Sequence, residues 1–361
     1  MPTEPGTTST KAAGANAAAL RSVRRPPSLP ITRVALLATF GLVVSAAVGR
    51  FVMHALRPDG QAPMVNEPVL CLAAALWSAG IAAQGPRWNA LLPPGGGVRR
   101  TLYSGLAVLG ANALTVTVPG PSGEALLTAF CARDFGVPWA TGGAAIFLAR
   151  LLGLGLLGAG ALAGVGLVPG GSAWAPAAGF ALGLGGLLVS TYLVAGRGLR
   201  GAVATVGGWL PAHLWRRIGP AVVGVVDQVL TPGAQPVRTW LTATAWSLVS
   251  TVLMAAGGYC SAVAVGVAPS PAIYLWMHAV SAVAGLVAMV IPAGIGPLDA
   301  LWVGLYVAVR ASGESEGEAL QQGVIAAVAW RQMQALSLLI SLGPLAWVGR
   351  RAAQPSAAQS T

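Results

Sequence analysis

The chain has 361 residues, of which 55% are hydrophobic and only 9% are charged, and its mean hydropathy is +0.71. A soluble domain of this size has no means of burying so much apolar surface, so the composition argues against a soluble protein and predicts an all-α polytopic membrane protein. The formal net charge of +11 does not indicate a nucleic-acid partner, because the arginines lie between apolar runs, where membrane topology signals are found, and not on one soluble face.

Cysteine and histidine patterns give no sign of a metal, a disulfide or a cofactor. These residues lie singly in the chain, at Cys71, Cys131, Cys260, His54, His213 and His278. No pair has the short spacing of a metal-binding or redox motif. His278 lies inside an apolar run, where a packing histidine is favoured over a polar relay.

The first part of the chain predicts a cytoplasmic tail and two crossings. Residues 1–33 are polar, basic and without helical periodicity, which is typical of a disordered cytoplasmic tail. Apolar runs at 34–53 and 68–83 are long enough to span a bilayer. The second run is followed by Arg87, Trp88 and further arginines, which predicts that it ends there and that the chain is again at the cytoplasmic face.

A broken hairpin is expected next. Residues 102–118 form an apolar run with Asn112 as a polar insertion, and the run meets helix-breaking residues at Pro119, Gly120 and Gly123. A second helix over 122–133 would be only about 18 Å long, which is too short for a hydrocarbon core of about 30 Å. The two pieces therefore predict a re-entrant hairpin that dips in from the cytoplasm and returns.

Glu124 is the candidate functional group of this hairpin. Ser122 is expected to act as the N-cap of the short helix, with Glu124 in its first turn. A helix N-terminus at membrane depth would receive an anionic headgroup while Glu124 takes a cation or an amine. The alternative is a structural ion pair between Glu124 and Arg150 on the following span, although ionisable groups at this depth are costly and usually functional.

The middle of the chain predicts two further crossings and a long cytoplasmic loop. The crossings are residues 139–168 and 177–195, and the loop is 197–238, which is rich in arginine. Its central part, 212–230, fits either an amphipathic helix on the cytoplasmic leaflet or a plain solvated loop, and the plain loop is favoured.

The second half repeats this arrangement from the opposite side. After a crossing at 240–265, the run 273–291 enters from outside and breaks at Pro292, Gly294 and Gly296. Asp299 then opens a short helix, an acidic outer loop follows, and a last span at 320–348 carries Arg331.

Two opposed hairpins, each followed by a span with one arginine, predict an inverted-repeat helical bundle whose site lies between the repeats. The expected domain is 34–348, with halves at about 34–196 and 239–348 and a cytoplasmic tail at 349–361.

The residues quoted above also carry a family resemblance. The stretch VPGPSGEALLTAFCARDFGVPWATGGAAIFLARLLGL and the later IPAGIGPLDALWVGLYVAVR resemble the transmembrane, flippase-like region of the lysylphosphatidylglycerol synthase/flippase family, the multiple peptide resistance factor type. Pro121 and Thr128 stand where that family often has basic residues, and Asp299 stands where it usually has glutamate. The resemblance implies lipid translocation, with Glu124, Arg150, Asp299 and Arg331 as the matching polar positions. No aminoacyl-transferring domain, and hence no enzyme activity, is expected.

The favoured function is therefore a bacterial plasma-membrane lipid translocator, with Glu124, Arg150, Asp299, Arg331, Asn112 and Ser122 as substrate-binding residues. Its partners would be membrane lipids, such as an anionic or aminoacylated phospholipid, together with a second copy of the chain or a lipid-modifying enzyme. Two alternatives stay open: an ion-coupled transporter of a small solute, and a non-transporting scaffold for envelope lipid or glycolipid synthesis. A membrane-embedded hydrolase is disfavoured, because no Ser/His or metal constellation accompanies the acids.

Overall fold

The computed structural model describes residues 65–117, 122–164, 205, 208, 212–230, 237–287, 297–309 and 314–353. All regular structure in these ranges is helical, which confirms the predicted all-α class. The helices are α3 (Glu67–Leu91), α4 (Gly97–Thr117), α5 (Ser122–Asp134), α6 (Trp139–Ala163), α9 (Ala212–Leu230), α10 (Val237–Ala264), α11 (Pro271–Val287), α12 (Pro297–Ala308) and α13 (Glu316–Ala353). The predicted spans at 34–53 and 177–195 lie outside the described residues.

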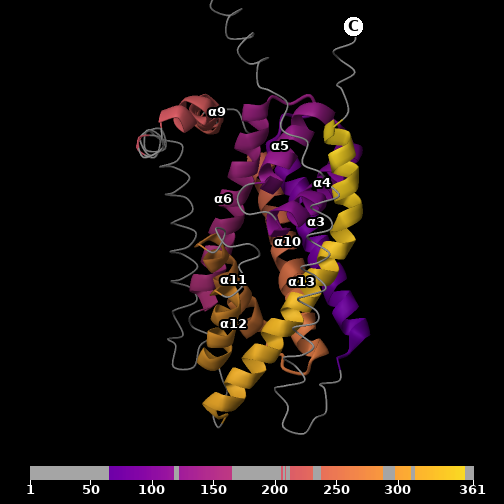
Figure 1. Cartoon of the computed structure of the whole chain (residues 1–361), viewed down its shortest axis with the longest axis vertical. Coiled ribbons are helices and arrows are strands. Elements are labelled where there is room, and N and C mark those ends of the chain that lie inside the picture. The colour runs from indigo at the N-terminus through magenta and orange to yellow at the C-terminus, as the bar shows by residue number, and fades with distance from the viewer. Residues whose placement is uncertain are drawn as a thin grey trace, which may run out of the picture.

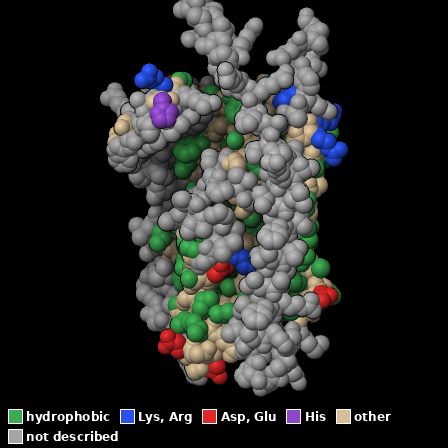
Figure 2. Space-filling view, viewed as in Figure 1, with side chains coloured by type: hydrophobic (Ala, Val, Ile, Leu, Met, Phe, Trp, Pro, Cys, Tyr) green, Lys and Arg blue, Asp and Glu red, His purple; other side chains and the backbone are tan. Residues whose placement is uncertain are grey.

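Most of the helices run along one axis and form an elongated bundle, while α9 lies across one end of it (Figure 1). Four helices are long and apolar enough to cross a membrane, namely α3, α6, α10 and α13. The short helices α5 and α12 lie in opposite halves of the bundle, α5 in the half that holds α9 and the C-terminal end of α13 (Figure 1). The charged ends of the molecule differ as well: basic side chains gather at the α9 end and acidic side chains at the other (Figure 2).

Close packing of α3 against α10 builds the centre of the bundle. Glycines allow this approach, because a Cβ atom on Gly257 would lie 2.7 Å from the Ala73 carbonyl oxygen of α3. Ser250 of α10 donates a hydrogen bond to the Gly80 carbonyl at 2.8 Å. Small residues and serine hydroxyls are the usual means of joining helices in a bilayer, where apolar burial alone gives no drive.

An aromatic cluster joins the second half of the chain to α3. The indole of Trp330 on α13 packs edge-on against Trp77 of α3, with ring centroids 6.2 Å apart. Trp330 also packs against Trp302 of α12, and Trp302 packs against Tyr274 of α11, at 5.7 and 5.2 Å. His278 lies edge-on to Trp77 at 5.9 Å and is buried, which agrees with a packing role.

Helix α3 is longer than the sequence predicts. The apolar run was expected to end near residue 83, but α3 continues through Gly85 and Pro86 to Leu91. Arg87 and Trp88 are consequently buried, at 7% and 2% exposure, so the prediction that they lie at the membrane interface is wrong. Helices do accommodate an internal proline inside a bundle, where neighbouring helices and polar side chains satisfy the freed carbonyl.

Residues 212–230 form helix α9, so the favoured prediction of a plain loop is wrong and the amphipathic helix is right. Apolar and polar residues separate onto two faces of α9 more strongly than in the other described helices. Its Val226 is buried, while His213 and Arg216 are exposed. The apolar face gains stability from packing near α6, which periodicity over a short Gly- and Pro-containing segment does not reveal.

Helix α13 begins earlier than expected, at Glu316, and a capping box explains this. The Ser315 hydroxyl accepts a hydrogen bond from the Glu318 backbone N–H at 3.2 Å, and the Glu318 carboxylate accepts one from the Ser315 N–H at 2.9 Å. This reciprocal pattern satisfies the free backbone donors of a helix start. The acidic segment predicted as an outer loop therefore supplies the first turn of the last helix.

Candidate functional site

The first polar pair at membrane depth joins Glu124 to Arg150. Glu124 lies in the first turn of α5, as predicted, and its Oε1 atom accepts a hydrogen bond from Arg150 Nη2 at 2.6 Å. Arg150 lies near the middle of α6, about 17 Å from the first residue of that helix. Half of the Arg150 side chain is exposed, against 20% for Glu124. The Glu124 Oε2 atom is buried and has no hydrogen-bond partner in the structure. This pair is therefore only partly satisfied by the protein.

The second pair joins Asp299 to Arg331. Asp299 lies in the first turn of α12, and both its oxygens accept hydrogen bonds from the guanidinium, at 2.7 Å from Nε and 3.0 Å from Nη2. Arg331 also donates to Gln334 at 3.1 Å and lies over the ring of Trp330, 4.9 Å from its centroid. A fork-to-fork pair of this kind fixes orientation as well as charge. The second pair is more completely satisfied than the first.

Ion pairs at both helices' ends show how α5 and α12 are placed. The last residue of α5, Asp134, pairs with Arg351 near the end of α13 at 3.6 Å, so this end of α5 lies at the basic end of the bundle. Glu124 is ten residues earlier and therefore about 15 Å deeper. Arg331 is twenty residues before Arg351, or about 30 Å along the tilted α13. The two pairs thus lie at staggered depths in the bundle.

The residues around Glu124 hold α5 tightly against α4. The Ser122 hydroxyl, predicted as an N-cap, donates to the Leu114 carbonyl of α4 at 3.3 Å. A Cβ atom on Gly123 would lie 2.0 Å from Thr115 Oγ1 and 2.6 Å from the Ala111 carbonyl oxygen, so only glycine fits here. Asn112 is partly buried on the same helix, and its predicted binding role stays a prediction.

The other predicted elbow residues, Pro119, Gly120, Pro292, Gly294 and Gly296, lie outside the described residues.

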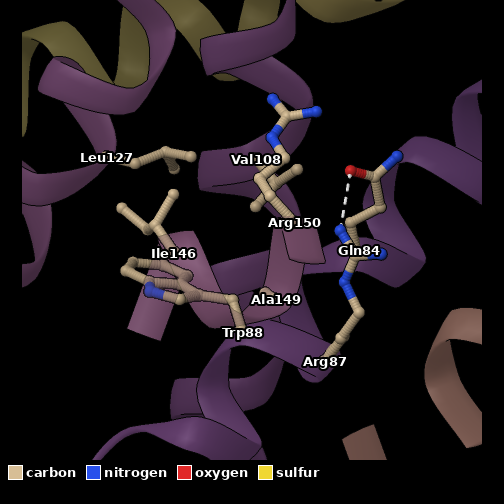
Figure 3. A pocket seen from close by; sticks show the side chains of 8 residues that line it. All are labelled: Gln84, Arg87, Trp88, Val108, Leu127, Ile146, Ala149 and Arg150. Carbon is tan, nitrogen blue, oxygen red and sulfur yellow. Dashed lines mark hydrogen bonds between the residues drawn. The ribbon is translucent and has the colours of Figure 1, made fainter. Parts of the chain in front are cut away.

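Two polar residues that the sequence did not single out line a small cavity beside Arg150. The cavity has a volume of about 30 Å³, which is room for roughly one water molecule. Gln84 and Arg87 of α3 lie on one side of it, and Trp88, Leu127 and Ile146 lie on the other (Figure 3). Arg87 Nη2 donates to Gln84 at 3.3 Å, and Arg87 Nε has no partner in the structure. Asp299 and Arg331 are not among the described residues that line this cavity.

Arg87 reaches this position because α6 leaves room for it. A Cβ atom on Gly153, one turn beyond Arg150, would lie 2.5 Å from Arg87 Nη1. The Gly-rich sequence of α6 thus lets a second guanidinium approach. The signal for Arg87 was present in the sequence as an ionisable residue next to an apolar run, but the preceding Gly85 and Pro86 made it resemble a helix-end topology residue.

The first site therefore combines two guanidinium groups, Arg87 and Arg150, with one carboxylate that has a free oxygen. Such a set accepts an anionic group at the arginines and a donor, such as an ammonium or a hydroxyl, at the carboxylate. No three His, Cys, Asp or Glu side chains within the described ranges lie close enough together to hold a metal ion. Cys71, Cys131 and Cys260 are free thiols.

Comparisons with curated proteins and with solved structures gave no match. A family model described as "Lysylphosphatidylglycerol synthase TM region" matches residues 34–341, a stretch that contains both ion pairs. Since the match covers most of the sequence and four helices have the length and composition of membrane spans, the chain is a multi-pass membrane protein that belongs to the lysylphosphatidylglycerol synthase transmembrane-region family.

Proposed function

We propose that the protein is a lipid translocator that moves a polar headgroup between leaflets past the two carboxylate–arginine pairs. The observation that carries the proposal is that each pair joins the first turn of a short helix to the interior of a membrane-spanning helix, Glu124 to Arg150 and Asp299 to Arg331. Replacing such pairs by packed hydrophobic groups is often neutral or stabilising, so stability alone gives no reason to keep two of them inside a membrane.

The lengths of the short helices support two re-entrant hairpins, α4–α5 and α11–α12. Helix α5 has 13 residues and α12 has 12, which correspond to about 20 and 18 Å, against a hydrocarbon core of about 30 Å. The placement of α5 and α12 in opposite halves of the bundle favours entry from opposite sides (Figure 1). An inverted repeat of this kind brings helix N-termini and carboxylates toward a shared path.

Partner exchange at the first pair gives the chemistry of binding. A headgroup phosphate competes with Glu124 for Arg150, which is half exposed, while Arg87 supplies further positive charge. The carboxylate released in this way, with its already unpartnered Oε2, takes an ammonium or hydroxyl donor of the same headgroup. The second pair, about 15 Å further along the bundle, would repeat the exchange while the acyl chains stay in lipid.

The family supports a zwitterionic or cationic headgroup. Its name refers to synthesis of a phospholipid that carries a lysyl group, which combines a phosphate with ammonium groups. A carboxylate beside two arginines complements that combination. The charge distribution supports a cytoplasmic C-terminus and a cytoplasmic α9, because basic side chains gather at that end of the bundle (Figure 2).

The test is a lipid-exchange assay in proteoliposomes that contain fluorescent phosphatidylglycerol, with dithionite added outside to bleach the accessible label. Wild type is expected to expose inner-leaflet label, and Glu124→Gln or Asp299→Asn to slow this exposure at least about tenfold, because loss of one charged hydrogen-bonding group removes about 1.5–3 kcal/mol. Glu316→Gln makes the same chemical change at an exposed position on α13 and should match wild type.

Equal exchange in wild type and in the Glu124 and Asp299 variants would contradict the proposal. Wild-type exchange no faster than in protein-free liposomes, together with acid variants that fail to fold, would favour the scaffold alternative. Uptake of a solute driven by a proton or sodium gradient without lipid exchange would favour the ion-coupled transporter.

A further inference from the structure

A second and larger cavity lies at the basic end of the bundle, apart from both ion pairs described above. Its volume is about 420 Å³, and it is enclosed by the loop between α3 and α4, the start of α4, and the ends of α5 and α13. The side chains that define its chemistry are Arg99, Arg100, Tyr103, Asp134, Phe135 and Arg351.

The charge of this cavity favours an anion. Three guanidinium groups face one carboxylate, which leaves two positive charges in excess. Asp134 pairs with Arg351 through Oδ1 at 3.6 Å, a long contact, and its Oδ2 atom is buried without a hydrogen-bond partner in the structure. The cavity thus offers arginine donors together with one acceptor for a hydroxyl or ammonium group.

Arg100 is the group that most clearly requires a ligand. Only 7% of it is exposed, and its guanidinium lies over the ring of Phe135 at 4.8 Å. Nη1 donates to the Pro93 carbonyl at 3.0 Å, but Nε and Nη2 are buried and have no acceptor in the structure. A buried guanidinium with two unused donors is unfavourable until an anion accepts from them.

The glycine loop keeps Arg100 in this position. Gly96 and Gly97 have φ angles of 74° and 53°, which side chains rarely adopt. A Cβ atom on Gly96 would also lie 2.6 Å from the Arg100 Cβ, so the loop folds directly over the stem of the arginine. The sequence PPGGGVRR therefore builds a cavity wall as well as a turn.

The outer surface of α4 shows that the anion belongs to a lipid. Val98 and Leu102 are 77% and 64% exposed, and each immediately precedes a residue that lines the cavity. Residues four apart share one face of a helix, so Val98, Leu102 and Leu106 form an exposed apolar stripe that starts beside the cavity and runs into the bundle's span. Acyl chains on this stripe would hold a phosphate at Arg99 and Arg100.

We propose that this cavity binds the phosphate of a phospholipid in the leaflet at the basic end, with Arg100 as the principal donor and Asp134 accepting from the rest of the headgroup. The inference goes beyond the proposed translocation, because binding at this cavity does not require that the lipid be moved.

The test is binding of dioctanoyl phosphatidylglycerol to the full chain in a non-ionic detergent, measured by microscale thermophoresis. We expect Arg100→Gln to weaken binding about tenfold or more, since a charged hydrogen-bond donor is lost. Arg216→Gln, which removes the same charge from the exposed surface of α9, should bind within about twofold of wild type. If Arg100→Gln does not fold, the Arg99→Gln/Arg351→Gln double variant decides, because Arg99 is exposed and Arg351 is 41% exposed.

Two further probes identify the source of the phosphate. Dioctanoylglycerol has the acyl chains without phosphate, and glycerol 3-phosphate has the phosphate without acyl chains, so neither should compete well. Unchanged affinity in the arginine variants, or equal binding of dioctanoylglycerol, would overturn the phosphate site. Equal competition by glycerol 3-phosphate would overturn the lipid assignment in favour of a soluble phosphate.

Discussion

Replacing Arg331 by glutamine is expected to lower the free energy of unfolding by about 3–5 kcal/mol, because it leaves the Asp299 carboxylate inside the bundle without its bidentate partner. The Arg331 side chain is only 16% exposed, and it also contacts the ring of Trp330, so glutamine restores neither the charge nor the stacking. Thermal and urea unfolding in detergent micelles, followed by tryptophan fluorescence, would measure the loss.

The double variant Asp299→Asn/Arg331→Gln separates charge from packing. Removing both charges should recover a large part of the lost stability, since neutral amides no longer pay the desolvation penalty of an isolated ion. A double variant as unstable as Arg331→Gln alone would show that the arginine acts through packing and not through the pair. Arg350→Gln, at the exposed end of the same helix, is the control and should change stability by less than about 0.5 kcal/mol.

Breaks in the apolar runs made the short helices predictable. Proline and glycine before Ser122 and before Asp299 signalled new helix starts, and the structure begins α5 at Ser122 and α12 at Pro297. The same breaks put one carboxylate in each first turn. The Glu124–Arg150 contact was one of two readings of the sequence, because an acid at membrane depth needs a cation and Arg150 was the nearest one along the next span.

Residues near helix-breaking signals were also where prediction failed. Gly85 and Pro86 resemble a helix end in sequence, yet α3 continues through them because α4 packs against this point. This tertiary contact buries Arg87 and places it beside Arg150, so the cavity between them was not predictable from local pattern. The cavity around Arg100 was missed for the same reason: its arginines come from α4 and α13, which are distant in sequence.

Helix α9 shows the converse case. Its two-faced pattern was visible in the sequence, but Gly219 and Pro220 within it reduced the expected helix propensity. Packing near α6 supplies stability that a propensity argument leaves out. The elements whose existence depended on tertiary contact were thus the ones that sequence reasoning misjudged, while those fixed by apolar length were right.

Gly85→Ala is expected to destabilise the protein by about 1–3 kcal/mol or more, an unusually large effect for one methyl group. A Cβ atom there would lie 2.3 Å from the backbone nitrogen of Gly105 and from the carbonyl carbon of Ser104, so the main chain of α4 itself would have to move. Displacing α4 from α3 would disturb the walls of the cavity that holds Arg87. The measurement is the midpoint of thermal unfolding, with Gly158→Ala on α6 as a matched control that meets open space.

Two causes contribute to this effect, and a second variant separates them. Gly85 precedes Pro86 inside a helix, where a residue with a Cβ atom is disfavoured by the proline ring, so Gly85→Ala adds local strain to the interhelical clash. Gly85→Ala/Pro86→Ala removes the local strain but keeps the clash, and it should therefore recover only part of the loss. The milder Gly105→Ala, whose Cβ atom would meet the Ala82 carbonyl oxygen at 3.1 Å, should fall between Gly85→Ala and the control. If all three single variants unfold at the same temperature, α3 and α4 are not in backbone contact at this point, and the route by which Arg87 reaches Arg150 would have to be rebuilt.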